Sequence, residues 1–106
     1  MKISDLIGMD SIFLDVSGSS QSSIFKEISS KVSEKIKISA NLILRRLNER
    51  ERLGSTAVGE GIAIPHAKVK GINKTYCFLF KLNNSISYDD NDQKFVDIIF
   101  VIIAPL

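Results

Sequence analysis

The sequence predicts an α/β protein in which two amphipathic helices precede a mainly apolar sheet. Apolar residues recur at helical spacing between residues 24 and 47, and two nearly continuous apolar stretches follow at 75–82 and 95–103. Strands of that kind are usually covered on both faces, so a central sheet between two layers is expected. Two helices are too few to form both layers. We therefore expect one domain over residues 1–106 that is incomplete at its C-terminal end.

The first helix is predicted by a serine-rich stretch at residues 17–23, whose hydroxyls can cap a helix N-terminus. We expect it to end near Ile38. Ser39 can cap a second helix, which Gly54 would stop. The apolar stripe of the first helix consists of Ile24, Phe25, Ile28, Val32 and Ile36, and that of the second consists of Ala40, Ile43, Leu44 and Leu47.

The strands follow a turn-rich segment at residues 54–67, which is rich in glycine and contains Pro65. Within it, residues 62–64 are expected to form a short strand, because the residue before a proline avoids helical angles. The two stronger strands at 75–82 and 95–103 are separated by a polar loop at 88–92.

The composition excludes several classes of function. The formal net charge is only +2 and no basic stripe occurs, so nucleic acid is not expected as a partner. The longest apolar run, residues 98–104, is far shorter than the roughly 20 residues that cross a bilayer, so no membrane insertion is expected. Cys77 is the single cysteine and no secretory signal is evident, so we expect a cytoplasmic protein.

The glycines at 54, 59 and 61 do not form a nucleotide-binding loop. A Walker-type loop requires a lysine and a hydroxyl where Glu60 and Gly61 stand. A dinucleotide fingerprint requires a glycine where Ile64 stands. Both interpretations therefore fail.

His66 is the only histidine, and it follows Pro65 at the end of the short predicted strand. A nucleophilic imidazole needs one unprotonated, exposed nitrogen and a hydrogen bond that fixes the other. Cationic and hydroxyl groups nearby could neutralise a phosphoryl group, and the local candidates are Arg50, Ser55, Thr56 and Lys68. Without the wider pattern, a solitary histidine such as His66 is more often a structural residue than a nucleophile.

The segment from Glu51 to Ala67 resembles the active-site pattern of a known family. Glu51 is followed after six residues by Val58–Gly59, then after two residues by the run Ile-Ala-Ile-Pro-His-Ala at 62–67. The pattern is similar to that of enzyme IIA domains of the bacterial phosphoenolpyruvate-dependent phosphotransferase system, of the fructose, mannitol and nitrogen-regulatory type (type 2). Within that family, the residues of this segment most resemble those of the nitrogen-regulatory branch. The resemblance implies a three-layer α/β/α sandwich with a central mixed sheet, whose C-terminal helices this chain lacks.

The resemblance also implies roles for individual residues. His66 matches the phosphoryl acceptor, Arg50 the active-site arginine, and Ser55 and Thr56 a pair of phosphate-binding hydroxyl residues. No metal and no cofactor is implied. Considered alone, Arg50 could pair with neighbouring glutamates on a helix surface, and the two hydroxyls could merely satisfy a turn.

The implied function is that of a phosphohistidine carrier in nitrogen-type regulation. Its donor would be a histidine phosphocarrier protein, and its acceptor or target a regulatory protein or a IIB domain. Two alternatives remain open: a sugar-specific (fructose or mannitol) IIA component that donates phosphate to a IIB domain, and a regulatory binding module without transfer activity.

Overall fold

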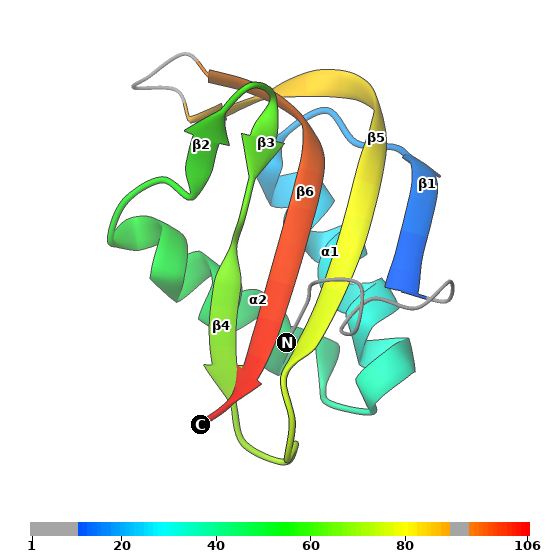
Figure 1. Cartoon of the computed structure of the whole chain (residues 1–106), viewed down its shortest axis with the longest axis vertical. Helices are drawn as coiled ribbons and strands as arrows, with labels where there is room; N and C mark the ends of the chain where they lie inside the picture. The colour runs from blue at the N-terminus through cyan, green and yellow to red at the C-terminus, as the bar shows by residue number, and fades with distance from the viewer. Residues whose placement is uncertain (1–10, 90–93) are drawn as a thin grey trace.

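A computed structural model describes residues 11–89 and 94–106 of the chain (Figure 1). Two helices and a sheet account for most of these residues. In chain order the elements are β1 (Ile12–Val16), α1 (Gln21–Ile36), α2 (Ala40–Arg52), β2 (Ala57–Gly59), β3 (Ile62–Ala63), β4 (His66–Val69), β5 (Tyr76–Asp89) and β6 (Lys94–Pro105).

Both predicted helices are confirmed, and serines cap them. The Ser20 side chain accepts a hydrogen bond from the Ser23 backbone N–H at the start of α1, and Ser39 accepts one from Leu42 at the start of α2. The first helix ends at Ile36, slightly earlier than expected, because Lys37 adopts a left-handed conformation (φ 61°) that closes it. Within the described part of the chain, no helix is long and apolar enough to cross a membrane.

The sheet is mixed, as the sequence predicted. Its strand order is β1-β5-β6-β3-β2, and β4 also pairs with β6, further along that strand than β3. The pairs β1–β5, β3–β6 and β4–β6 are parallel, whereas β5–β6 and β2–β3 are antiparallel. The long hairpin of β5 and β6 therefore forms the centre of the sheet.

The strand boundaries differ from the prediction in two places. β5 runs on to Asp89, so Tyr88 and Asp89 lie in a strand and not in the predicted loop, whose remaining residues lie outside the described ranges. Pairing of Ile86 with Val96 on β6 extends the strand through polar residues that have little β propensity of their own. The short strand at 62–64 ends at Ala63, and a separate strand begins at His66 after Pro65, which cannot donate to a ladder.

A tight hairpin turn places the short strands before His66. Glu60 (φ 59°) and Gly61 (φ 79°) link β2 to β3, and two successive positive φ angles are what such a two-residue turn requires. A Cβ atom at position 61 would also lie 3.0 Å from the Asp97 carboxylate. Gly61 is therefore needed for both the turn and the close approach to β6.

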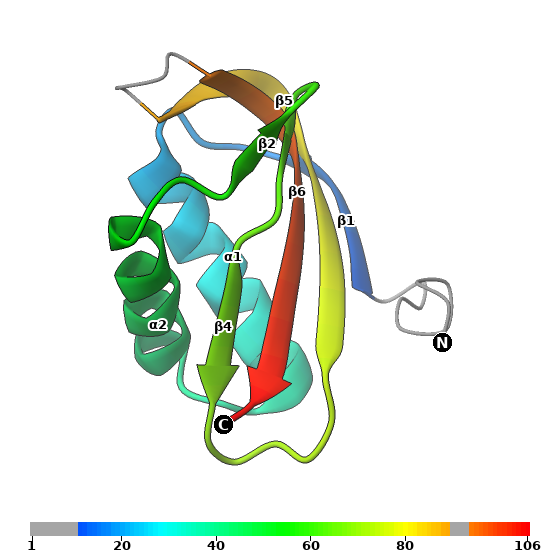
Figure 2. The same ribbon diagram turned by 60° about the vertical axis from the view of Figure 1, so that its left-hand side comes forward.

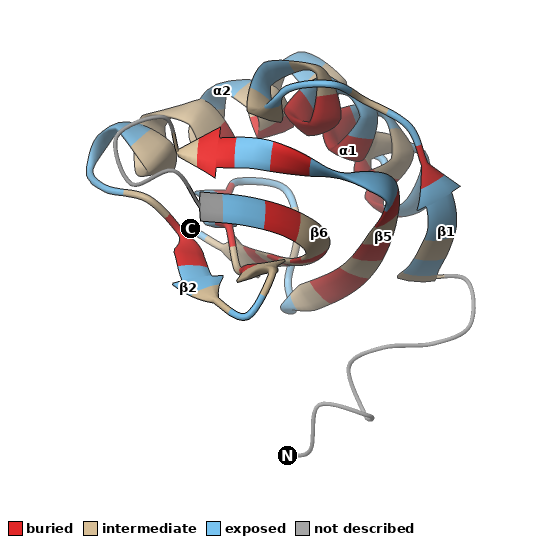
Figure 3. Cartoon of the chain, turned by 90° about the horizontal axis from the view of Figure 1, so that it is seen from above, coloured by how far each residue is buried: buried red, intermediate tan, exposed pale blue. Residues whose placement is uncertain are grey.

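Both helices pack on the same face of the sheet (Figures 2 and 3). The core lies between these two layers, and residues of β5 and β6 that alternate along each strand point into it. Its fully buried members include Ile24, Phe25, Ile28, Ile43, Leu47, Phe78, Phe80, Ile99 and Ile103. The α/β class is thus confirmed, with helices and sheet supplying two layers of the expected sandwich.

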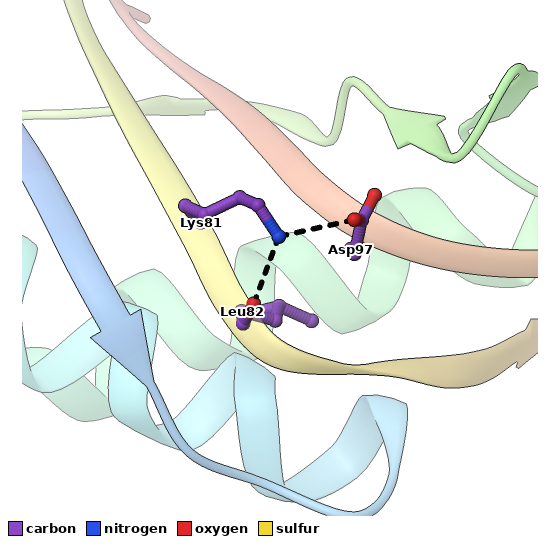
Figure 4. Close-up of polar contacts among 3 residues, drawn as sticks. All are labelled: Lys81, Leu82 and Asp97. Carbon is purple, nitrogen blue, oxygen red and sulfur yellow. Dashed lines mark hydrogen bonds and ion pairs between the residues drawn. The ribbon is translucent and has the colours of Figure 1, made fainter.

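The other face of the sheet is only partly buried in this chain. Ile98, Phe100 and Ile102 alternate with the core residues of β6 and keep intermediate exposure. An ion pair joins the two central strands, with Lys81 Nζ 3.0 Å from Asp97 Oδ2 and also bonded to the Leu82 carbonyl (Figure 4). Such a half-exposed pair contributes about 0–1 kcal/mol, so the hairpin depends mainly on its backbone ladder.

Candidate active site

His66 is held at the start of β4 with its side chain exposed. Its backbone lies opposite Ile102 in the parallel pairing of β4 with β6. The preceding residue, Pro65, is buried, and its carbonyl accepts a hydrogen bond from the Ile102 N–H at 3.1 Å. The ring therefore projects from fixed backbone into solvent, and it is not sealed in the interior.

The hydrogen bonds of the imidazole define its tautomer. Nδ1 lies 3.2 Å from the Ile64 carbonyl oxygen, which can only accept, so Nδ1 carries the proton. Arg50 Nε donates to Nε2 at 3.1 Å, so Nε2 acts as the acceptor. The ring is thus neutral, with the lone pair of Nε2 on the side of Arg50.

Arg50 reaches the ring from the last turn of α2, a helix that packs against β4. The guanidinium also donates from Nη1 to the Gly54 carbonyl at 2.9 Å. Its hydrogen bonds therefore go to the ring and to the turn after α2, whereas the neighbouring carboxylate Glu49 pairs with Arg46 at 3.1 Å. The fold brings together the two residues that the sequence singled out as catalytic.

A groove of about 550 Å³ opens beside the imidazole. Its side chains come from the end of α2 and from β4 and β6, and they are Arg46, Glu49, Arg50, Leu53, His66, Ala67, Lys68, Ile102, Ala104 and Leu106. Three of them are cationic and one is a carboxylate. This excess of positive charge favours an anionic group next to the ring.

Ser55 and Thr56 lie on a different side of the turn after α2. Thr56 is buried, and its hydroxyl bonds to the Glu51 carboxylate and lies 2.8 Å from the Tyr88 hydroxyl. Ser55 accepts a hydrogen bond from the Ala57 N–H at 3.1 Å and lines a neighbouring groove of about 660 Å³ together with Glu51. The structure therefore does not bring these two hydroxyls into the groove beside His66.

A buried cluster around Glu51 was missed by sequence reasoning. The Tyr88 hydroxyl donates to Glu51 Oε1 at 3.3 Å, and Gln21 Nε2 donates to Glu51 Oε2 at 3.4 Å. Burial raises the pKa of the Tyr88 phenol well above its ordinary value of 10.0, so it stays protonated and remains a donor. Only the place of Glu51 in the motif signalled this cluster, since Tyr88 had been assigned to a loop.

Metal-binding groups are absent from the described ranges 11–89 and 94–106, in which no three histidine, cysteine or carboxylate side chains cluster in a way that could hold an ion. Cys77 is a buried free thiol, and burial raises its pKa.

Known proteins are similar to this chain in sequence and in fold. The family model "Phosphoenolpyruvate-dependent sugar phosphotransferase system, EIIA 2" matches residues 5–106. The chain is 31% identical over 105 residues to a nitrogen regulatory protein of Bradyrhizobium diazoefficiens, covering 99% of the chain and 69% of that protein. It is 37% identical over 109 residues to a nitrogen regulatory protein homologue of Haemophilus influenzae, covering 99% and 66%.

A solved structure is also similar to this chain in fold. The nitrogen regulatory protein IIA-Ntr of Neisseria meningitidis superposes with a TM-score of 0.87 at 28% identity, over 97% of this chain and 70% of that one. The chain thus spans about two thirds of the length of the relatives it matches.

Proposed function

The chain belongs to the EIIA 2 family of the phosphoenolpyruvate-dependent sugar phosphotransferase system, and on that premise we propose that His66 accepts a phosphoryl group. The donor is a histidine phosphocarrier protein, and the phosphorylated chain acts in nitrogen-type regulation. One observation supports this most strongly: Nε2 of an exposed, neutral imidazole faces Arg50 while Nδ1 is fixed by the Ile64 carbonyl.

The transfer is a displacement at phosphorus. The lone pair of His66 Nε2 forms the new N–P bond, and the N–P bond to the donor imidazole breaks with its electron pair returning to the donor nitrogen. The donor leaves as a neutral imidazole that keeps the proton on its other nitrogen. His66 keeps its own proton on Nδ1, where the Ile64 carbonyl stabilises the positive charge that the ring gains. No proton needs to move.

Arg50 supplies most of the charge stabilisation in this proposal. Phosphoryl transfer requires mainly positioning and neutralisation of the equatorial oxygens. Arg50 Nε occupies the approach to Nε2 in the free protein, so its N–H groups can pass from the ring nitrogen to the oxygens of the incoming group. Nη1, held by Gly54, keeps the guanidinium at the site meanwhile.

The two hydroxyl residues take different places in this scheme. The Ser55 hydroxyl accepts from the Ala57 N–H, a bond that leaves its own proton available to an anion. The Thr56 hydroxyl, in contrast, already donates its hydrogen bond to the Glu51 carboxylate. We therefore retain Ser55 as a candidate phosphate ligand after movement of the turn, and assign Thr56 to holding the turn in place.

The test is phosphorylation of the chain by the general phosphotransferase proteins and phosphoenolpyruvate, followed by intact-mass measurement. Wild type should gain one acid-labile phosphate and His66→Ala none. Lys70→Ala, an exposed change just after β4 and outside the groove, is the control and should gain the phosphate like wild type. A wild type that gains no phosphate would contradict the proposal and leave the purely regulatory binding function.

A sugar-transport role is the second candidate, and the family's own description, which names sugar, favours it. In that role the phosphoryl group passes from His66 to a IIB domain. Mixing the phosphorylated chain with fructose- or mannitol-type IIB domains separates the two roles. Rapid loss of phosphate from His66 to a IIB domain indicates transport, whereas retention supports regulation.

A further inference from the structure

The Glu51 carboxylate binds the turn that follows α2. Its Oε2 accepts a hydrogen bond from the Thr56 backbone N–H at 3.2 Å, and its Oε1 accepts one from the Thr56 hydroxyl. Gln21 and Tyr88 donate to the same carboxylate at 3.4 and 3.3 Å. A helix residue is thereby joined to α1 and to β5 as well as to the turn.

One branch of this network leads to the imidazole. The Thr56 carbonyl accepts a hydrogen bond from the Ile64 N–H at 2.9 Å. The carbonyl of Ile64 in turn accepts a hydrogen bond from His66 Nδ1 at 3.2 Å. Thr56, which Glu51 holds at two atoms, thus fixes the residue that sets the tautomer of His66.

The other branch leads to the guanidinium. Gly54 lies between α2 and Thr56, its N–H donates to the Glu51 carbonyl at 3.1 Å, and its own carbonyl accepts from Arg50 Nη1 at 2.9 Å. Gly54 has a φ of 147° and nothing packs where its Cβ would stand, so its orientation depends on the bonds at its ends. The Glu51 backbone carbonyl holds the N–H of Gly54, and the Glu51 carboxylate holds Thr56 two residues further on.

We propose that Glu51 is a positioning residue for phosphoryl transfer. It holds the 54–56 turn so that Arg50 bonds to Nε2 of His66 while the Ile64 carbonyl bonds to Nδ1. The inference rests on the proposed function. No hydrogen bond of the described structure joins Glu51 to the ring, so Glu51 acts only through Thr56 and Gly54. The role requires a carboxylate, because a carboxylate accepts at both oxygens and never donates.

The decisive variant is Glu51→Gln, with Glu27→Gln as its matched control. An amide keeps one acceptor oxygen and replaces the other by an NH2 group, which cannot accept the hydrogen bonds that the carboxylate accepts at that atom, so the turn shifts while side-chain volume is kept. Glu27 is also helical, but its carboxylate forms an exposed 3.8 Å ion pair with Lys31 of the same helix. Two readouts are needed, the rate of phosphorylation and the ¹⁵N NMR signals of the His66 ring.

We expect Glu51→Gln to lower kcat for phosphorylation about 10-fold, because small misplacements of reacting groups cost up to about 100-fold. The KM for the donor should stay unchanged, since Glu51 is not on the rim of the His66 groove. The ring signals should change from one Nδ1–H tautomer to a mixture. Glu27→Gln should match wild type in all three measurements.

Thr56→Val tests the same network if Glu51→Gln does not fold by circular dichroism, because it removes one hydroxyl and keeps the shape. It should lower kcat in the same direction by a smaller factor. Unchanged kcat and an unchanged single tautomer in a folded variant would overturn the role of Glu51. A wild type that is not phosphorylated would defeat the proposed function instead, and the ring signals, which need no donor, would still decide the role of Glu51.

Discussion

Arg50 and Glu51 are neighbours in the last turn of α2, yet their side chains serve regions of opposite character. Arg50 lines the open groove of His66, where its partners are an exposed ring and one carbonyl. Glu51 enters a cluster that includes the buried Thr56 and Tyr88. In the proposed function, one turn of helix thus supplies both a group that contacts the phosphate and a group that holds the site.

The two side chains differ in how firmly their hydrogen bonds hold them, and each degree of restraint fits a different role. A solvent-exposed hydrogen bond is weak and readily exchanged, which suits a guanidinium that must leave Nε2 when phosphate arrives. A half-buried carboxylate with several donors, among them those of the buried residues Thr56 and Tyr88, is costly to disturb, which suits a fixed support. Substitutions in the open groove should therefore change transfer and leave stability intact, whereas substitutions in the buried cluster should change both.

Arg50→Ala should have the largest effect. Loss of one donor to a developing oxyanion costs about 100- to 1,000-fold in rate, and Arg50 is the guanidinium in contact with the reactive nitrogen. The midpoint of urea unfolding should move little. Arg45→Ala, an exposed change on the same helix, should leave the rate of phosphorylation unchanged. If Arg50→Ala transfers normally, the division of tasks is wrong and Arg50 is only a surface residue.

Thr56→Val should destabilise the fold by about 1–3 kcal/mol, because it leaves buried polar partners without a hydrogen bond. Urea denaturation measures this as a fall in the free energy of unfolding. Thr75→Val, at an exposed position, should stay within about 0.5 kcal/mol of wild type. Equal stability of the two variants would show that the Glu51 cluster is not the rigid region of the site.

His66 and Arg50 of the open groove stand out in the sequence, whereas the hydrogen bonds that join Glu51, Thr56 and Tyr88 in the buried cluster could not be predicted from it. His66 and Arg50 belong to a recognisable motif. The two helices were predicted correctly because N-caps and apolar spacing are local signals. The second half of β5 passes through Asn83, Asn84 and Ser85, and only pairing with β6 makes it a strand. Since that pairing delivers Tyr88 to Glu51, the cluster depends on contacts between distant residues.

Alkaline pH should destabilise the buried cluster around Glu51 and Tyr88 before it affects the His66 groove. Burial raises the pKa of Tyr88 above 10.0 in the folded state, so above that pH the unfolded chain loses a proton that the folded chain keeps. The unfolding free energy therefore falls as pH rises past about 10, and it is unaffected by Tyr88 at lower pH. Tyr88→Phe should show a shallower fall in urea titrations between about pH 8 and pH 11. Parallel curves for the two proteins would place the Tyr88 phenol in solvent.

The smallest effect is expected from the ion pair of Arg46 and Glu49 at the edge of the His66 groove. Its 3.1 Å contact is between side chains that are 37% and 43% exposed, and such pairs couple by about 0.2–1 kcal/mol. A double-mutant cycle of Arg46→Ala and Glu49→Ala should give a coupling energy in that range, and salt should reduce it because exposed charges are screened. A coupling energy that is large and insensitive to salt would mean that the groove has a rigid, desolvated wall. The two regions beside α2 would then not differ, because the residues of the His66 groove would be held as rigidly as those of the cluster around Glu51.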